Sequence, residues 1–159
     1  MPAVNRGTLS DMPGRFVISH SEMHESPTHR ATRYHRELAK SIIMTNRSPD
    51  LPFSQSINPY RGCEHGCIYC YARPNHAYVD LSPGQDFESE IFCKENAAEV
   101  LRESLRKPGY QCQPVVLGTA TDPYQPAERE RRLTREMLQV LADSQDPFSL
   151  ITKSTLVLR

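Results

Sequence analysis

The sequence lacks several features that define common classes of protein. No apolar run approaches the roughly 20 residues that a membrane-spanning helix needs. The N-terminus has no basic and then apolar segment followed by small residues, so we expect no secretory signal. The 19 basic and 19 acidic residues give a formal net charge of zero, so whole-chain charge neither indicates nor excludes a nucleic-acid partner. These absences favour a cytoplasmic protein without membrane contact.

Three of the chain's five cysteines lie within eight residues. Cys63, Cys67 and Cys70 form a C-x3-C-x2-C pattern in the segment YRGCEHGCIYCYARP. In a reducing cytoplasm such a cluster more often binds a metal than forms disulfides. A structural zinc site needs four ligands, usually as two separated pairs, and the sequence has no second pair downstream. His65 lies between the cysteines, where ligation would need a cramped loop.

Three thiolates suit two kinds of metal centre, zinc and an iron–sulfur cluster. A [4Fe–4S] cluster has four irons, so full protein ligation would need four cysteines. Three cysteines leave one iron open to a small molecule, which a catalytic cluster requires and an electron-transfer cluster avoids. The alternative is zinc bound by the same loop in a non-catalytic structural or interaction protein.

The composition changes near residue 52. Residues 1–52 are polar and hold four of the six histidines at irregular spacing, which predicts a flexible leader rather than a metal site. A short helix is expected over residues 37–44. Beyond this segment we expect strands at 53–58, 114–122 and 147–154, and helices at 96–109 and 126–144.

The predicted order β-α-β-α-β indicates parallel strands joined by right-handed crossovers. Active sites of such sheets and barrels lie at the carboxyl ends of the strands. The cysteine loop, the GTATD turn after the second strand and the TKS turn after the third all follow strands directly. We therefore expect these three segments to meet at one edge of a parallel sheet.

The cysteine pattern, with Tyr69 directly before the third cysteine, resembles the cluster motif of radical S-adenosylmethionine enzymes. The wider segments NPYRGCEHGCIYCYARP, GTATDPYQPAERE and ITKS resemble those of the DNA repair photolyase group, relatives of spore photoproduct lyase. The resemblance covers about residues 48–159. It implies an α/β fold in which residues 53–159 form the N-terminal part of a partial (β/α)6 barrel with parallel strands, truncated after the third strand.

The resemblance also implies a chemistry. The three cysteines would ligate a [4Fe–4S] cluster whose fourth iron binds S-adenosyl-L-methionine, and reductive cleavage of that cofactor would give a 5′-deoxyadenosyl radical. An electron donor such as flavodoxin or ferredoxin would be a partner, and nucleic acid is the implied substrate. Spore photoproduct lyases use a cysteine hydrogen donor near the end of the second strand, where this chain has Thr119.

Further candidate roles follow from the same resemblance. Tyr69 would pack against the cluster and the adenine, and Tyr71, the candidate catalytic residue, would lie near the path of the radical. Arg61 and Arg73 flank the loop, where they would favour an anionic cluster or a phosphate, or simply lie at the surface. At the strand ends, Gly118, Thr119 and Thr121 would contact the methionine end of the cofactor, or simply form a strand end followed by a turn. Lys153 and Ser154 would contact the carboxylate or ribose of the cofactor, and the plain interpretation of Lys153 is a solvated lysine at a strand end.

Overall fold

The computed structural model describes residues 30–159, which form two compact units. Among these residues, unit 1 comprises 30–35 and Arg61–Phe92, and unit 2 comprises Arg36–Tyr60 and Cys93–Arg159. The first 29 residues of the predicted leader, with His20, His24 and His29, lie outside the described residues.

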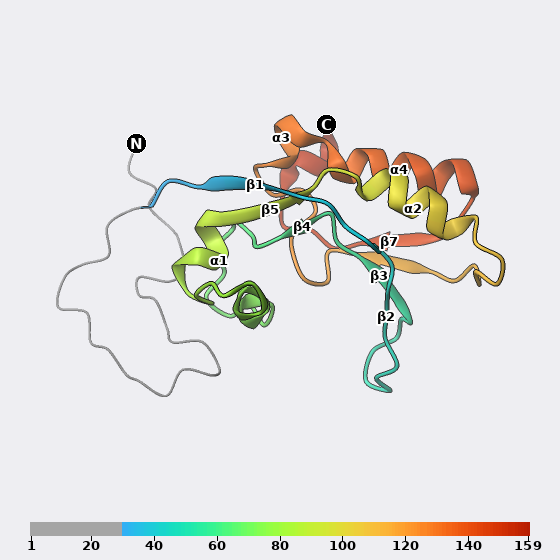
Figure 1. The fold of residues 1–159 in the computed structure, drawn as a ribbon, viewed down its shortest axis with the longest axis horizontal. Helices are drawn as coiled ribbons and strands as arrows, with labels where there is room; N and C mark the ends of the chain where they lie inside the picture. The colour runs from blue at the N-terminus through green and yellow to red at the C-terminus, as the bar shows by residue number, and fades with distance from the viewer. Residues whose placement is uncertain (1–29) are drawn as a thin grey trace. The chain divides into compact units, whose positions relative to one another are not determined.

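Unit 2 contains a four-stranded sheet in the order β2-β3-β6-β7 (Figure 1). The β3–β6 and β6–β7 pairs are parallel, and β2 pairs with β3 in the antiparallel direction. Leu117 lies in register between Ile57 and Leu150. The strands are β2 (Met44–Thr45), β3 (Gln55–Ile57), β6 (Val115–Leu117) and β7 (Phe148–Leu150).

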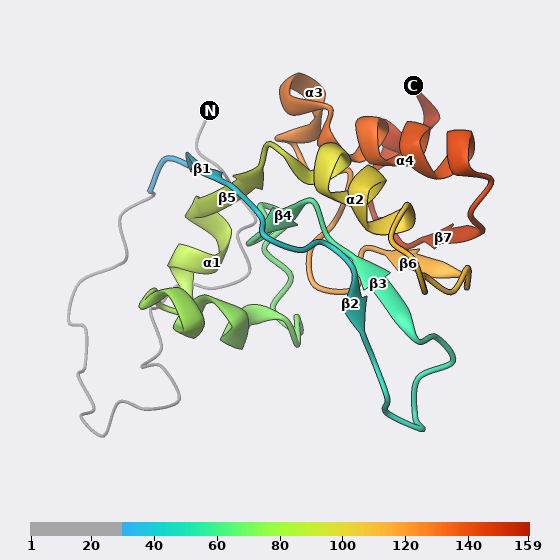
Figure 2. The same cartoon turned by 45° about the vertical axis from the view of Figure 1, so that its right-hand side comes forward.

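Two helices, α2 (Ala97–Leu105) and α4 (Leu133–Ser144), lie side by side over one face of this sheet (Figures 1 and 2). Their apolar residues recur at helical spacing, which places one stripe of each helix against the strands. The resulting core of unit 2 consists of buried side chains from both helices, two strands and the segment before β2. These residues are Ile42, Ile57, Ala97, Leu101, Val115, Leu117, Met137, Val140 and Leu141.

The helix expected over residues 126–144 is divided into α3 (Glu128–Arg131) and α4. The break falls at Arg132, whose backbone has φ +54°, a left-handed conformation that ends a helix. The carboxylate of Glu128 then accepts hydrogen bonds from the backbone N–H groups of Thr134 and Arg135, both at 3.1 Å. Glu128 thereby satisfies two of the N–H groups that the first turn of α4 leaves without helical partners.

Unit 1 contains the cysteine loop and two short helices, η1 (Arg73–Val79) and α1 (Gln85–Ser89). Its interior is partly aromatic, because the ring of the fully buried His76 contacts the ring of Phe87 edge to face at 5.1 Å. A second sheet has the order β1-β5-β4, and the boundary between the units falls within each of its strands. These strands are β1 (Arg33–Glu37), β4 (Tyr60–Arg61) and β5 (Glu90–Lys94).

The predicted fold class, the N-terminal part of a partial (β/α)6 barrel, is wrong. Residues 30–159 form two small sheets and few helices, with an antiparallel strand beside the parallel ones in unit 2, and no parallel barrel. The prediction failed because many of the elements are short and have polar sequences, which give no regular apolar pattern. Strands β1 and β2 come from the predicted leader, and η1, α1 and β5 fill residues 73–94.

Two smaller expectations also differ from the structure. The helix expected over 37–44 is replaced by an irregular segment between β1 and β2, whose Ile42 is buried in the core. The helix expected over 96–109 is shorter, and the side-chain amide of Asn96, directly before α2, donates to the Ala39 carbonyl and accepts from the Ala39 N–H, at 2.9 and 2.8 Å. No helix in residues 30–159 has the length and apolar character needed to cross a membrane.

Candidate functional site

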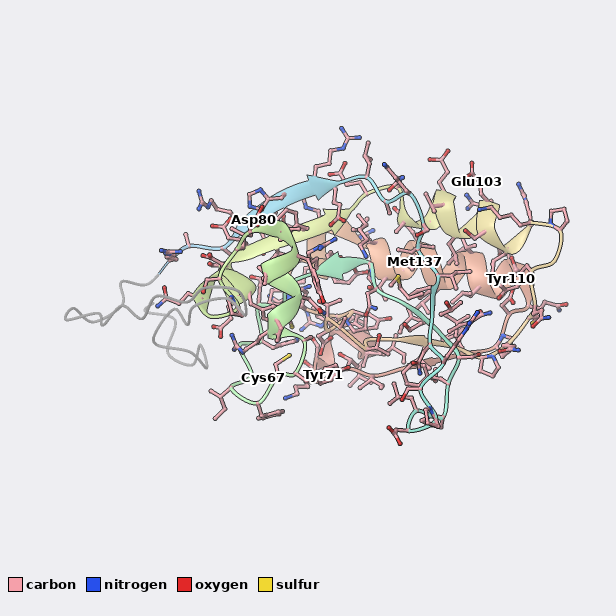
Figure 3. The ribbon with its side chains drawn as sticks, turned by 60° about the horizontal axis from the view of Figure 1, so that its bottom comes forward. Cys67, Tyr71, Asp80, Glu103, Tyr110 and Met137 are labelled. Atoms are coloured by element: carbon pink, nitrogen blue, oxygen red, sulfur yellow. The ribbon has the colours of Figure 1, made fainter. Side chains whose placement is uncertain are left out.

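The three clustered cysteines lie on one irregular loop of unit 1, between β4 and η1. Cys63 is buried, whereas Cys67 and Cys70 are half-buried, and none of the three forms a disulfide. The backbone N–H of Cys63 donates to the Phe87 carbonyl at 2.9 Å, so the start of the loop is attached to α1. Figure 3 shows the side chains of Cys67 and Tyr71 on this loop.

Gly62 makes the turn into the cysteine loop. Its φ of +83° lies in the left-handed region that favours glycine. A Cβ atom at this position would lie 2.9 Å from both the Phe87 carbonyl oxygen and a ring carbon of His76. The backbone at Gly62 therefore packs closely against α1, directly before the first cysteine of the motif.

Arg73 supports the loop from within unit 1. Its guanidinium donates through Nε and Nη2 to the carbonyl oxygen of Cys67, at 3.1 and 2.9 Å. Nη1 donates to the Gly84 carbonyl at 3.0 Å, and Nη2 forms an ion pair with the buried carboxylate of Glu88. Arg73 is therefore a buried residue that holds the backbone of the loop, and neither of the roles expected from the sequence, charge complementarity or surface exposure, accounts for these contacts.

The two tyrosines assigned to the site by resemblance are exposed, Tyr69 by 75% and Tyr71 by 78%. Aromatic side chains of this size are usually at least partly buried in a protein without ligands. Ile68, also exposed, lies beside them in the sequence. The loop thus presents apolar side chains to solvent next to its two half-buried thiols.

The donor chemistry of this loop fits an iron–sulfur cluster or another thiophilic metal, because it provides three soft thiolates within eight residues. The arrangement of the side chains is a separate question. Within residues 30–159, no three side chains of His, Cys, Asp or Glu lie close enough together in this structure to bind a metal ion. Ligation would therefore need side-chain rotation, which the half-buried positions of Cys67 and Cys70 allow.

In unit 2, Asn58 links the carboxyl ends of β3 and β6. Its side-chain Nδ2 donates to Oγ1 of Thr119 at 3.1 Å, and its Oδ1 accepts from the N–H of Ala120 at 3.0 Å. Its own carbonyl accepts from Nζ of Lys94 at 2.9 Å. No sequence motif marks Asn58 for this role in fixing the GTATD turn, because the role depends on contacts that only folding creates.

Asp122 makes the corresponding link between the ends of β6 and β7. Its carboxylate accepts from Oγ1 of Thr152 at 2.7 Å and from the backbone N–H of Lys153 at 2.8 Å. Next to this link, Gly118 has φ +92°, and a Cβ there would lie 2.2 Å from the carbonyl oxygen of Ile151. The turns after β6 and β7 therefore meet at the carboxyl ends of parallel strands, within unit 2.

The remaining candidates at these turns have contacts of different kinds. Thr121 is buried, and its hydroxyl accepts from Nε2 of Gln125 at 3.0 Å. Ser154 precedes η2 (Thr155–Leu158), and its hydroxyl accepts from the N–H of Leu156 at 3.2 Å. Lys153 is exposed. Structural roles in a turn and a helix cap thus account for Thr121 and Ser154.

Tyr60 is a fully buried residue of unit 2. Its hydroxyl donates to the carboxylate of Glu128, the residue that caps α4. Burial raises the pKa of Tyr60 far above its usual value, and the negative charge of Glu128 raises it further. The phenol therefore stays protonated and acts as a donor across the whole physiological pH range.

Comparisons with known proteins give relatives over nearly the whole chain. An uncharacterized protein of Mycobacterium bovis and one of Mycobacterium tuberculosis are each 41% identical over 162 residues, which covers 99% of this chain and 47% of the relative. An uncharacterized protein of Methanocaldococcus jannaschii is 32% identical over 121 residues, covering 76% of this chain and 42% of that protein. The chain thus spans about half the length of the curated relatives it matches. No family model and no solved structure matches it.

Proposed function

We propose that this chain carries the cluster-binding loop of a radical S-adenosylmethionine enzyme, with Cys63, Cys67 and Cys70 as the ligands of a [4Fe–4S] cluster. The observation that carries the proposal is the presence of three cysteines without disulfides, in C-x3-C-x2-C spacing, on one short loop. Three ligands from the protein leave one iron for the amino and carboxylate groups of S-adenosyl-L-methionine. When bound, such a cluster supplies the electron that cleaves the sulfonium of this cofactor.

The protein's part in this chemistry is to fix the loop and to shield the cofactor. Arg73 holds the Cys67 carbonyl from the buried side, so the segment that carries the thiols has a defined backbone position. Cys63 is attached to α1 through its N–H and is itself buried. The exposed rings of Tyr69 and Tyr71 are the side chains proposed to cover the adenine and the path of the radical.

The proposed contacts to the methionine end of the cofactor involve the turns after β6 and β7. Gly118 brings backbone close to its neighbour without a side chain, as a ligand-facing turn requires. Asn58 orients the side chain of Thr119, and Asp122 orients the backbone of Lys153. Gly118, Thr119 and Lys153 are therefore the preferred candidates for contact with the cofactor. The hydroxyls of Thr121 and Ser154 accept hydrogen bonds within the turn and the η2 cap, and each hydroxyl also has an O–H donor, so both stay in the proposed set.

The wider setting of this reaction is also part of the proposal. Reduced thiols and an oxygen-sensitive cluster suit the cytoplasm, where a flavodoxin or ferredoxin supplies the electron. Nucleic acid is the substrate class that the resemblance implies. The mycobacterial relatives extend well beyond the matched region, which covers 47% of their length, so the substrate half of the site is assigned to segments outside this chain.

Metal content tests this proposal directly. After anaerobic reconstitution with iron and sulfide, the protein is expected to hold about four iron and four sulfide ions per chain. Serine in place of Cys63, Cys67 or Cys70 is expected to reduce cluster content severely. The matched control is Cys112→Ser, because Cys112 is an exposed thiol outside the loop. About one zinc ion per chain and no sulfide would overturn the proposal and support the zinc-binding alternative.

A further inference from the structure

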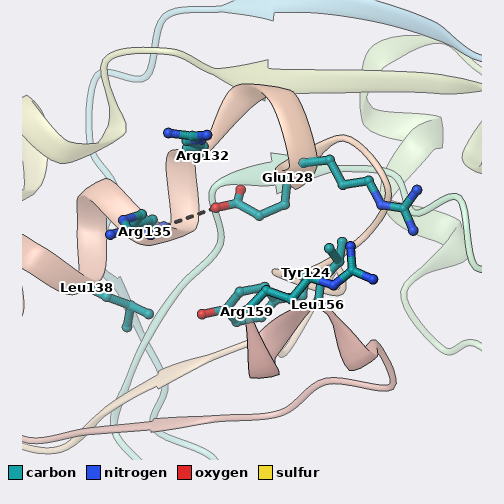
Figure 4. Close-up of a pocket in the computed structure, with 8 residues that line it drawn as sticks. Tyr124, Glu128, Arg132, Arg135, Leu138, Leu156 and Arg159 are labelled. Carbon is teal, nitrogen blue, oxygen red and sulfur yellow. Dashed lines mark hydrogen bonds between the residues drawn. The ribbon is translucent and has the colours of Figure 1, made fainter.

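Four arginines surround one cavity of unit 2, away from the cysteine loop in sequence. The cavity has a volume of about 540 Å³ and lies between the start of α4, the segment before α3 and the η2 segment. Figure 4 shows Arg132, Arg135 and Leu138 along α4, with Tyr124, Leu156 and Arg159 on the other side. The lining residues are Tyr124, Glu128, Arg129, Arg132, Arg135, Leu138, Leu156 and Arg159.

The charge of this cavity is not balanced by the side chains around it. Among residues 30–159, none of the four lining guanidinium groups has an ion pair or a side-chain hydrogen bond. By contrast, Arg131, in the same segment but outside the cavity, pairs with Glu95. Placing several cations side by side without counter-charges costs free energy, which a bound anion would recover.

Glu128, the one carboxylate in the lining, does not serve as this counter-charge. It is buried, and its oxygens accept hydrogen bonds from the hydroxyl of Tyr60 and from the backbone N–H groups of Thr134 and Arg135. Its contacts therefore stabilise the start of α4 rather than the guanidinium groups. The four arginine side chains and Glu128 together carry a net formal charge of about +3, by the ordinary ionisation of arginine and glutamate.

We propose that this cavity binds a small phosphorylated ligand of nucleotide size. Arginine suits phosphate because its planar guanidinium donates two parallel hydrogen bonds and keeps its charge at all relevant pH values. The cavity volume of about 540 Å³ falls in the usual range for small-molecule sites. The ring of the half-buried Tyr124 and the side chains of Leu138 and Leu156 provide an apolar wall for a base or another ring.

This site is independent of the proposed cluster chemistry, because no cavity residue belongs to the cysteine loop. Binding can therefore be measured on the full 159-residue chain without iron. The probe is adenosine diphosphate, titrated by calorimetry at low and at physiological salt, beside adenosine and pyrophosphate. Adenosine diphosphate is expected to bind, more weakly at high salt, and adenosine without phosphate is expected not to bind.

Variants then locate the site. The double variant Arg132→Gln/Arg135→Gln is expected to weaken binding by about tenfold for each guanidinium removed, as for a lost charge-assisted hydrogen bond. Arg102→Gln, which removes an exposed arginine of α2 outside the cavity, is the matched control and is expected to bind like the parent. Thermal unfolding of each variant confirms that the fold is kept.

Three results would overturn the proposal. The first is no binding of adenosine diphosphate at low salt by the folded parent chain. The second is equal binding by the parent and the double variant, which would place the ligand elsewhere. The third is binding of a short single-stranded oligonucleotide in the absence of nucleotide binding, which would replace the small ligand by a nucleic acid.

Discussion

The side chain of Arg73 holds the backbone of Cys67, with two guanidinium nitrogens within 3.1 Å of its carbonyl oxygen. The same guanidinium is paired with Glu88, and the two side chains are exposed by only 10% and 1%. A buried ion pair therefore lies directly beneath the loop that carries the three thiols. Its loss would affect both the stability of unit 1 and the position of Cys67.

We expect Arg73→Gln to lower the free energy of unfolding by about 3 kcal/mol, because it leaves the Glu88 carboxylate buried without its counter-charge. Urea unfolding followed by circular dichroism measures this change. The control, Arg102→Gln on the surface of α2, is expected to change stability by less than about 0.5 kcal/mol.

The double variant Arg73→Gln/Glu88→Gln separates the charge from the shape of the pair. It is expected to recover part of the lost stability, since no unpaired buried charge is left. A loss below about 1 kcal/mol for Arg73→Gln alone would show that the pair is not a buried support of the loop.

Two glycines with nearly the same backbone conformation provide a matched test of the turn after β6. Gly118 has φ +92° and Gly109 has φ +88°, but a Cβ on Gly118 would meet the Ile151 carbonyl at 2.2 Å, whereas nothing lies within 4 Å of a Cβ on Gly109. We expect Gly109→Ala to cost about 1 kcal/mol, the strain of a left-handed alanine. Gly118→Ala is expected to cost roughly 3 kcal/mol or more, because overpacking adds to that strain.

Equilibrium unfolding of both variants checks this difference. Equal destabilisation by the two substitutions would contradict the close approach of Gly118 to Ile151. The clash that Gly118→Ala creates with the Ile151 carbonyl is also expected to weaken the β6–β7 pairing, because the N–H of Ile151 donates to the Leu117 carbonyl at 3.0 Å.

Tyr60 predicts how stability depends on pH in the alkaline range. Its pKa in the folded protein is raised far above the ordinary value of 10.0, first by burial and then by Glu128. The unfolded chain therefore loses the phenol proton near pH 10 while the folded protein retains it. Stability contributed by this group is fully present below about pH 10 and falls as the pH rises above that value.

Unfolding measured from neutral pH to about pH 11 tests this expectation. Tyr60→Phe is expected to cost about 1 to 3 kcal/mol at neutral pH, because Glu128 loses a hydrogen-bond donor. The variant's stability should then fall less steeply above pH 10 than the parent's, although Tyr110 and Tyr124, whose pKa values are also raised, preserve part of the decline. Parallel profiles for the two proteins would contradict the assignment.

The sequence predicted the elements whose apolar residues recur regularly. Val115–Leu117 is a continuous apolar strand, and Leu133, Met137, Val140 and Leu141 mark one stripe of α4, so both were located from pattern alone. Strand β1, with the sequence RYHRE, has no such pattern. It is attached instead by polar contacts, among them those from Arg33 and His35 to the carboxylate of Glu90.

The candidate site was predictable to a similar extent. The spacing of the cysteines is a sequence signal, and so is the Gly118-Thr119 turn that follows a strand. The supporting residues Arg73, Asn58 and Asp122 carry no such signal, because their roles depend on carbonyls and hydroxyls that are brought near only by folding. The break at Arg132 likewise carries no sequence signal, because it depends on a single backbone angle. This break divides the expected long helix beside the arginine cavity.

The most direct test of the central claim is the electron paramagnetic resonance spectrum of the reconstituted, dithionite-reduced protein, recorded with and without S-adenosyl-L-methionine. The proposal predicts a reduced [4Fe–4S] signal that changes when the cofactor is added, because Cys63, Cys67 and Cys70 leave one iron open. Absence of any cluster signal, with zinc retained by the same cysteines, would contradict it.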